Sequence, residues 1–265
     1  DHRDLHSFPT RRSSDLFEII TNEIVTEFSA NHDGEAIGVR TGTGKYFKTD
    51  FVVIAAGVKA NVDFAREAGI ILGETGAIRV NKNMQTNIQN IYACGDCAEK
   101  TFMLNGSKMW VPLGSTANKE GRVVAMNLFG LGETFDGILC SAVVRCMSLT
   151  MSMTGLTVKK ALSLGFNPIF VTVTKEDKVG YMPDVNNITL KLIADKTTGL
   201  LLGGQAIGAP GADKRINALT SALLGRLTIE EFNKNDFTYA PPYSTTIDPL
   251  LNAAQLLAKM YKENH

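Results

Sequence analysis

From Phe17 onward, apolar and polar positions alternate along the chain. Residues 17–30 and 36–40 alternate β-branched or aromatic side chains with polar ones, and a turn-forming NHDG tetrad at 31–34 separates them. A second polar turn, at 41–45, leads to residues 51–57, a short continuous apolar run typical of a buried sheet strand. The pattern therefore predicts a β-meander followed by a buried strand that ends, at Gly57, close against another part of the fold.

The next stretch predicts a strand, a glycine turn and a helix in that order. Residues 91–96 form a second apolar run, which ends at Gly95 and Asp96. Residues 115–128 then repeat with the helical period, and Gly130 is placed to end that helix.

After Phe135 the pattern changes to a mixture of strands and helices. Strands are predicted at 141–153, 169–173, 189–194 and 200–207, the last two joined as a hairpin. Helices are predicted at 157–164 and at 212–223, where an apolar stripe recurs and ends near Gly225. A short helix is predicted to begin at a capping box formed by Thr228 and Glu231. A last helix is predicted to begin at Pro249, with Asp248 as its N-cap. These elements predict an α+β unit that follows an α/β one.

Composition narrows the class of protein. Hydrophobic residues make up 44% and charged residues 20%, which fits a folded protein. The 27 basic residues equal the 27 acidic ones, so the net charge does not favour nucleic acid as a partner. No apolar run reaches the roughly 18 residues that span a bilayer, so no membrane association is expected. The few cysteines, Cys94, Cys97, Cys140 and Cys146, suit a reducing compartment and hence the cytoplasm.

Residues 1–16 differ from the rest of the chain. They show neither helical nor strand periodicity, and they stop abruptly where the alternating pattern begins. The segment 7–16 resembles a translated sequencing-adapter oligonucleotide, which would make 1–16 a non-native leader. The alternative is a polar native tail.

The strongest chemical signal is the segment TNIQNIYACGD at 86–96. A buried strand that delivers a glycine lets the backbone approach a ligand, and the following carboxylate can accept a hydroxyl hydrogen bond. The segment resembles the second FAD fingerprint of the pyridine nucleotide-disulfide oxidoreductases, T-x-x-x-x-I-Y-A-x-G-D. The resemblance implies that Gly95 lies against FAD and that Asp96 holds a ribityl hydroxyl. The alternative is a surface Gly-Asp turn after an ordinary strand.

Two neighbouring segments extend this resemblance. Residues 52–61 are similar to the turn that closes the family's NAD(P)H-binding domain, with Gly57 matching and Ala60 where the family usually has proline. Residues 112–122 are similar to the start of the helix whose N-terminal amides face the flavin pyrimidine. The resemblance implies cofactor contacts at Leu113, Gly114, Ser115, Thr116 and Ala117. Without the family, Ser115 is an N-cap and Gly121 a packing glycine.

Three C-terminal segments, at 154–157, 214–216 and 239–244, resemble the dimerisation domain of coenzyme A disulfide reductases and related NADH oxidases. The resemblance implies a homodimer in which Tyr243 and Tyr181 reach the partner subunit's active site. A phenol there can donate a hydrogen bond to a departing sulfur. The alternative is that both tyrosines only pack at an interface.

Other catalytic arrangements lack support in the sequence. Cys94 and Cys97 straddle the FAD fingerprint and are interpreted as packing residues, and no second pair at ligand spacing suggests zinc or another metal. The four histidines form no triad pattern. No G-x-G-x-x-G follows a strand, so the resemblance places both dinucleotide fingerprints and the redox cysteine upstream of this sequence. We therefore expect no turnover from this chain by itself.

The combined interpretation is a fold of class α/β plus α+β. It comprises a non-native leader (1–16), the end of an NAD(P)H-binding domain (17–61), the C-terminal segment of a Rossmann-like FAD-binding domain (62–138) and a dimerisation domain (139–265). The resemblance implies a parent flavoprotein that passes electrons from NAD(P)H through FAD to a disulfide such as that of coenzyme A. The alternatives are an oxidase or peroxidase that reduces oxygen or peroxide, and a dimerisation module without a ligand.

The leader hypothesis makes a direct prediction about DNA. Sequencing the parent gene upstream of the codon for Phe17 should show a native reading frame that diverges from residues 1–16. A native coding sequence that continues through these codons would reject the hypothesis.

Overall fold

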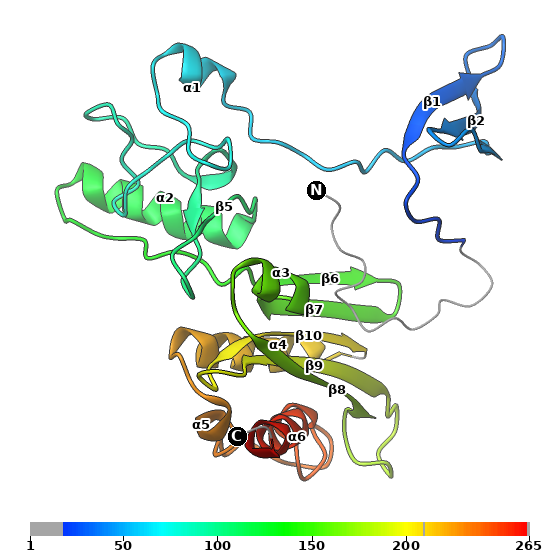
Figure 1. Cartoon of the computed structure of the whole chain (residues 1–265), viewed down its shortest axis with the longest axis vertical. Helices are drawn as coiled ribbons and strands as arrows, with labels where there is room; N and C mark the ends of the chain where they lie inside the picture. The colour runs from blue at the N-terminus through cyan, green and yellow to red at the C-terminus, as the bar shows by residue number, and fades with distance from the viewer. Residues whose placement is uncertain (1–17, 209, 264–265) are drawn as a thin grey trace. The chain divides into compact units, whose positions relative to one another are not determined.

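The computed structural model describes residues 18–208 and 210–263, so the leader predicted at 1–16 lies outside the described residues. The described chain forms two compact units that divide between Lys59 and Ala60. The first unit is an antiparallel sheet with strand order β1-β2-β3, formed by β1 (Val25–Ala30), β2 (Ala36–Thr41) and β3 (Tyr46–Lys48) (Figure 1). The Asn31 side chain accepts the amides of Asp33 and Glu35, which closes the predicted turn.

The buried strand expected at 51–57 is wrong. These residues form no strand, and the side chains of Phe51, Val53 and Ile54 are 76%, 73% and 72% exposed. The run has the apolar and β-branched residues typical of a strand. It forms none because a strand needs a hydrogen-bonded neighbour, and none of the described strands pairs with it.

The second unit begins with short elements around a small core. They are α1 (Asp63–Glu67), the 3-10 turn η2 (Gly95–Cys97), the paired β4 (Lys100–Thr101) and β5 (Lys108–Met109), and the long helix α2 (Gly114–Leu128). The strand expected at 91–96 is also wrong, because only an isolated bridge joins Tyr92 to Gln85. Loops therefore position the GD turn, and they pack on Val62, Ala65, Ile78, Met84, Ala93 and Ala98.

Residues 139–263 form the predicted α+β arrangement. Five antiparallel strands have the order β6-β7-β10-β9-β8. Their bounds are β6 (Ala142–Cys146), β7 (Leu149–Gly155), β8 (Pro168–Glu176), β9 (Asn187–Asp195) and β10 (Leu201–Gly208). The single strand expected at 141–153 is in fact the hairpin β6–β7, which turns at Met147 with a φ of 52°. The predicted hairpin of the last two strands is confirmed.

Four helices accompany this sheet, namely α3 (Val158–Ser163), α4 (Ala212–Leu224), α5 (Ile229–Phe232) and α6 (Pro249–Glu263). Helix α4 packs on β7 and β10, and α6 packs on β8 and β9 (Figure 1). Alternate residues of β9, among them Leu190 and Leu192, are buried in one core cluster with Leu219 of α4 and Leu257 of α6. The main core of the unit lies between the sheet and these two helices.

The two predicted helix starts in this region are confirmed. Thr228 accepts the amide of Glu231 at 3.2 Å, and the Glu231 carboxylate accepts the amide of Thr228 at 2.8 Å, which completes the capping box. The Asp248 carboxylate accepts the amide of Leu250 at 2.8 Å at the start of α6. Among the described residues, no helix is both long enough and apolar enough to cross a bilayer.

Helix α4 provides a matched test of this core. Leu219→Ala removes a fully buried side chain and should lower the free energy of unfolding by about 2–5 kcal/mol, because it leaves a cavity between α4 and the sheet. Leu224→Ala, on the same helix at 60% exposure, should change it by less than about 1 kcal/mol. Urea unfolding of the two variants measures both values, and equal losses would contradict the assigned packing.

Candidate functional site

Contacts to both backbone polar groups of Gly95 hold the GD turn. Gly95 has a φ of 79°, a conformation that glycine adopts without strain. Its amide donates to Glu120 Oε2 at 2.6 Å, and its carbonyl accepts from Lys100 Nζ at 2.6 Å. A Cβ built at Gly95 would lie 3.6 Å from the Cβ of Ala117. The turn therefore packs directly on the first turns of α2.

Asp96 is exposed. Its backbone carbonyl is hydrogen-bonded to another of the described residues, whereas its carboxylate is not. The Asp96 carbonyl accepts the indole N–H of Trp110 at 2.7 Å. Within the described part of the chain, no group donates a hydrogen bond to the Asp96 carboxylate. A free carboxylate on a fixed backbone suits the recognition of a ligand hydroxyl.

Helix α2 begins without a side-chain cap. Its N-cap residue is Leu113, whose carbonyl accepts the amides of Thr116 and Ala117. The interpretation of Ser115 as an N-cap is therefore wrong, because Ser115 lies inside the helix. Among the described residues, none accepts a hydrogen bond from the amides of Gly114 and Ser115, and both residues are exposed. This helix end offers two open donors and the positive end of the helix dipole.

The other predicted residues of this helix are more enclosed. Thr116 is buried and Ala117 half-buried, so they anchor the helix start more than they extend from it. A Cβ at Gly121 would meet no atom within 4 Å, so Gly121 is not a packing glycine. Gly57 belongs to the first unit, where a Cβ would likewise meet no atom within 4 Å. Its φ of 95°, and not the close packing expected from sequence, accounts for the glycine.

These groups fit a flavin dinucleotide. The uncapped amides of α2 suit an electron-rich ring or an anionic group, and the free Asp96 carboxylate suits a polyol hydroxyl. Glycine at position 95 keeps the turn free of a side chain next to α2. The donors and the acceptor come from elements that pack on one another.

The cysteines near this turn have the properties of packing residues. Cys94 and Cys97 are free, half-buried and packed against the small core, and Cys97 Sγ lies 3.4 Å from the Cys94 carbonyl. Burial raises the pKa of the Cys94 thiol, and burial raises that of Cys140 to about 11. A protonated thiol is a weak nucleophile. No group of three or more His, Cys, Asp or Glu side chains in the described ranges is arranged to hold a metal ion.

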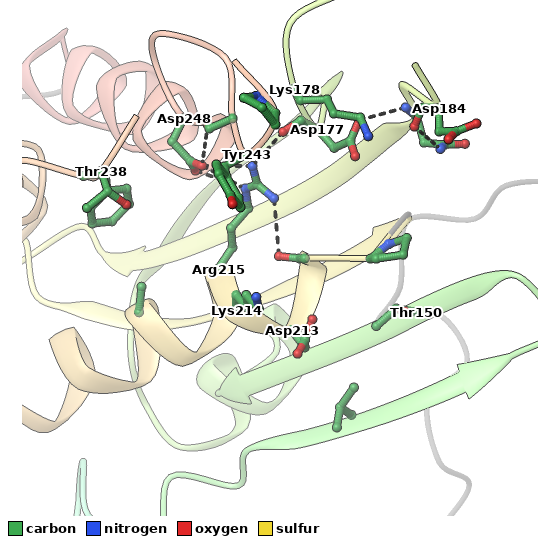
Figure 2. Close-up of a pocket in the computed structure, with 18 of the residues that line it drawn as sticks. Thr150, Asp177, Lys178, Asp184, Asp213, Lys214, Arg215, Thr238, Tyr243 and Asp248 are labelled. Atoms are coloured by element: carbon green, nitrogen blue, oxygen red, sulfur yellow. Dashed lines mark hydrogen bonds and ion pairs between the residues drawn. The ribbon is translucent and has the colours of Figure 1, made fainter. Parts of the chain in front are cut away.

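A separate pocket of about 1130 Å³ lies in the sheet-and-helix part of the second unit (Figure 2). Tyr243 lines it and is 79% exposed. Tyr181 is 76% exposed and lies on the loop between β8 and β9. Other residues of this loop, Asp177, Lys178 and Asp184, line the pocket, but Tyr181 does not. The structure therefore brings Tyr243, but not Tyr181, to this pocket.

An ion pair that sequence reasoning missed supports the wall next to Tyr243. Arg215 on α4 contacts Asp248 at 2.9 Å, with side-chain exposures of 9% and 12% (Figure 2). Arg215 also donates to the carbonyl of Asp177 at 3.1 Å, and the Ser244 hydroxyl donates to Asp248 at 2.9 Å. Asp248 was predicted only as a helix cap. Its second role depends on a residue 33 positions away, which no local pattern reveals.

Comparisons with known proteins agree with this arrangement. Two models described as pyridine nucleotide-disulphide oxidoreductase match the chain, one at residues 16–121 and the other, for the dimerisation domain, at 141–250. Together they cover most of the chain, which belongs to the pyridine nucleotide-disulphide oxidoreductase family. This family uses FAD and NAD(P)H.

Several relatives have informative names. The chain is 37% identical to an NAD(P)H sulfur oxidoreductase (CoA-dependent) of Pyrococcus furiosus, over 83% of this chain and 49% of that protein. It is 36% identical to an NADH oxidase of Methanocaldococcus jannaschii, over 80% and 47%. It is 30% identical to a coenzyme A disulfide reductase of Staphylococcus epidermidis, over 76% and 46%.

Structural similarity confirms the predicted fold class. An NAD-dependent persulfide reductase from A. fulgidus matches with a TM-score of 0.86 and 34% identity, over 92% of this chain and 45% of that one. The chain spans about half the length of the curated relatives it matches.

The Arg215–Asp248 pair can be tested by mutation. Asp248→Ala should lower the free energy of unfolding by about 3–5 kcal/mol, because Arg215 would keep a buried charge without its partner. Asp63→Ala is the control, since the Arg66–Asp63 pair is exposed, and it should cost less than about 1 kcal/mol. Chemical denaturation compares the two variants, and a small loss for Asp248→Ala would show that the pair is not desolvated in solution.

Proposed function

We propose that this chain is the FAD-contacting and dimerisation part of a flavoprotein that passes electrons from NAD(P)H through FAD to a disulfide, such as coenzyme A disulfide. The observation that carries the proposal is the packing of the Gly95–Asp96 turn against the uncapped start of α2. The names of the Pyrococcus furiosus and Staphylococcus epidermidis relatives support a sulfur compound or coenzyme A disulfide as the acceptor.

Each group has a defined role in this proposal. Bound FAD supplies a two-electron carrier between the nicotinamide and the sulfur substrate. The Asp96 carboxylate accepts a ribityl hydroxyl and so orients the cofactor. The amides of Gly114 and Ser115 stabilise negative charge on the nearby ring. Leu113, Thr116 and Ala117 shape the surface against which the ring lies.

The dimerisation part has a separate role. The protein forms a homodimer, which the dimerisation-domain match supports. Tyr243, and with it Tyr181, extends toward the partner subunit's active site, where a phenol donates a hydrogen bond to the departing sulfur. Their high exposure supports this role. The free cysteines favour a reducing compartment such as the cytoplasm.

A second candidate is the reduction of oxygen or peroxide. The observation that favours it is the 36% identity to a protein named NADH oxidase. The same FAD-contacting groups serve both reactions.

Flavin binding tests the proposal directly. Titration of the purified 265-residue chain with FAD, followed by flavin fluorescence, should show saturable binding. Asp96→Ala should weaken that binding by about 10-fold or more, because one charge-assisted hydrogen bond is lost. Asp136→Ala is the control, since this exposed carboxylate contacts only Lys82 among the described residues. A colourless, stably folded dimer without affinity for FAD would instead support the dimerisation module without a ligand.

A further inference from the structure

A buried ion pair contacts both backbone polar groups of Gly95, the glycine of the proposed flavin site. Glu120 Oε2 accepts the Gly95 amide and Lys100 Nζ donates to the Gly95 carbonyl, both at 2.6 Å. Lys100 Nζ lies 3.4 Å from Glu120 Oε1, and the two side chains are 1% and 0% exposed. Both hydrogen-bonding groups of one glycine are thus held by opposite charges that have no access to water.

Stability alone does not account for this pair. Moving two charges from water into a protein interior is costly, and apolar residues of similar volume often stabilise a fold at least as well. Lys100 has a further acceptor in the Ala98 carbonyl at 2.8 Å, but Glu120 Oε1 is buried without a hydrogen bond. Burial raises the pKa of Glu120 despite the amide of Gly95 and the charge of Lys100, which both lower it. The carboxylate is therefore retained at an energetic cost.

The pair connects the two elements that carry the proposed cofactor contacts. Lys100 follows η2 closely in the chain, and η2 includes Asp96. Glu120 lies on α2, six residues after the first open amide at Gly114. Glycine adopts positive and negative φ with similar ease, so the Gly95 peptide has other accessible orientations unless it is held. A change in its orientation would redirect Asp96 relative to the start of α2.

We propose that Lys100 and Glu120 are positioning residues for the flavin: by holding both the N–H and the C=O of Gly95, they fix the direction of the Asp96 carboxylate relative to the open amides of α2. The inference rests on the FAD binding proposed above and adds two residues that do not themselves contact the cofactor. Their effect is transmitted through Asp96.

A neutral replacement of the pair tests this role. Lys100→Met combined with Glu120→Gln removes both charges at nearly constant volume, which avoids leaving one buried charge alone. In the full 265-residue chain, this double variant should bind FAD about 10-fold more weakly, while its urea midpoint stays close to that of the unaltered chain. Lys100→Met combined with Glu120→Met is the second variant should the first double variant unfold. It also leaves no buried charge alone, it removes the acceptor of the Gly95 amide as well, and it should weaken FAD binding in the same direction. Lys82→Met, at an exposed ion pair, is the control and should leave FAD binding unchanged.

Coupling to Asp96 distinguishes positioning from a general structural role. With Asp96→Ala already present, the neutral pair should weaken FAD binding no further, because the carboxylate that it directs is gone. Losses that add in full would overturn the inference, and so would unchanged FAD binding by the neutral variant, while both leave the proposed function standing. If neither the unaltered chain nor Lys82→Met binds FAD, the proposed function fails, and this inference fails with it.

Discussion

Close packing against two glycines of β10, at the centre of the five-stranded sheet, sets how near α4 and the backbone of residue 156 lie to the sheet. A Cβ at Gly204 would lie 2.5 Å from a methyl group of Leu219, and one at Gly203 would lie 2.5 Å from the backbone of Leu156. Because Gly203 and Gly204 carry no side chains, α4 approaches β10 closely at Gly204 and the backbone of Leu156 approaches it closely at Gly203. On the same helix, Arg215 pairs with Asp248 at the start of α6, and both residues line the pocket beside Tyr243.

The sequence predicted the elements that depend on local chemistry. The start of α6 at Asp248 and the capping box of α5 depend on residues at most three positions apart, and both are confirmed. The strands at 51–57 and 91–96 were predicted wrongly, because an apolar run indicates burial potential but not whether a neighbouring strand is present to pair with it. The turn within 141–153 was missed because β-branched residues continue on both sides of it.

The candidate site divides in the same way. Gly95, Asp96 and the start of α2 were recognised because they form continuous motifs in the chain. The Lys100–Glu120 pair was not, since its partners are 20 residues apart and charged residues are seldom fully buried. The missing cap of α2 also had no sequence signal, because Ser115 is an ordinary capping residue that lies two positions too late. A helix without an N-cap side chain is about 1 kcal/mol less stable than a capped one. Binding sites often carry such a cost in stability, because the groups that bind a ligand must stay without a partner in the protein.

The edge strand β6 has a consequence for how this domain evolves. All five of its residues are exposed, and Val143 and Val144 are 61% and 52% exposed. Neither of these two side chains belongs to the hydrophobic core of the domain, whereas Leu190 and Leu192 are buried in it. Packing within the domain therefore constrains Leu190 and Leu192 but not positions 143 and 144. Substitution rates in homologues at 143 and 144 therefore record the selective pressure exerted by whatever covers this edge, separately from the pressure to fold.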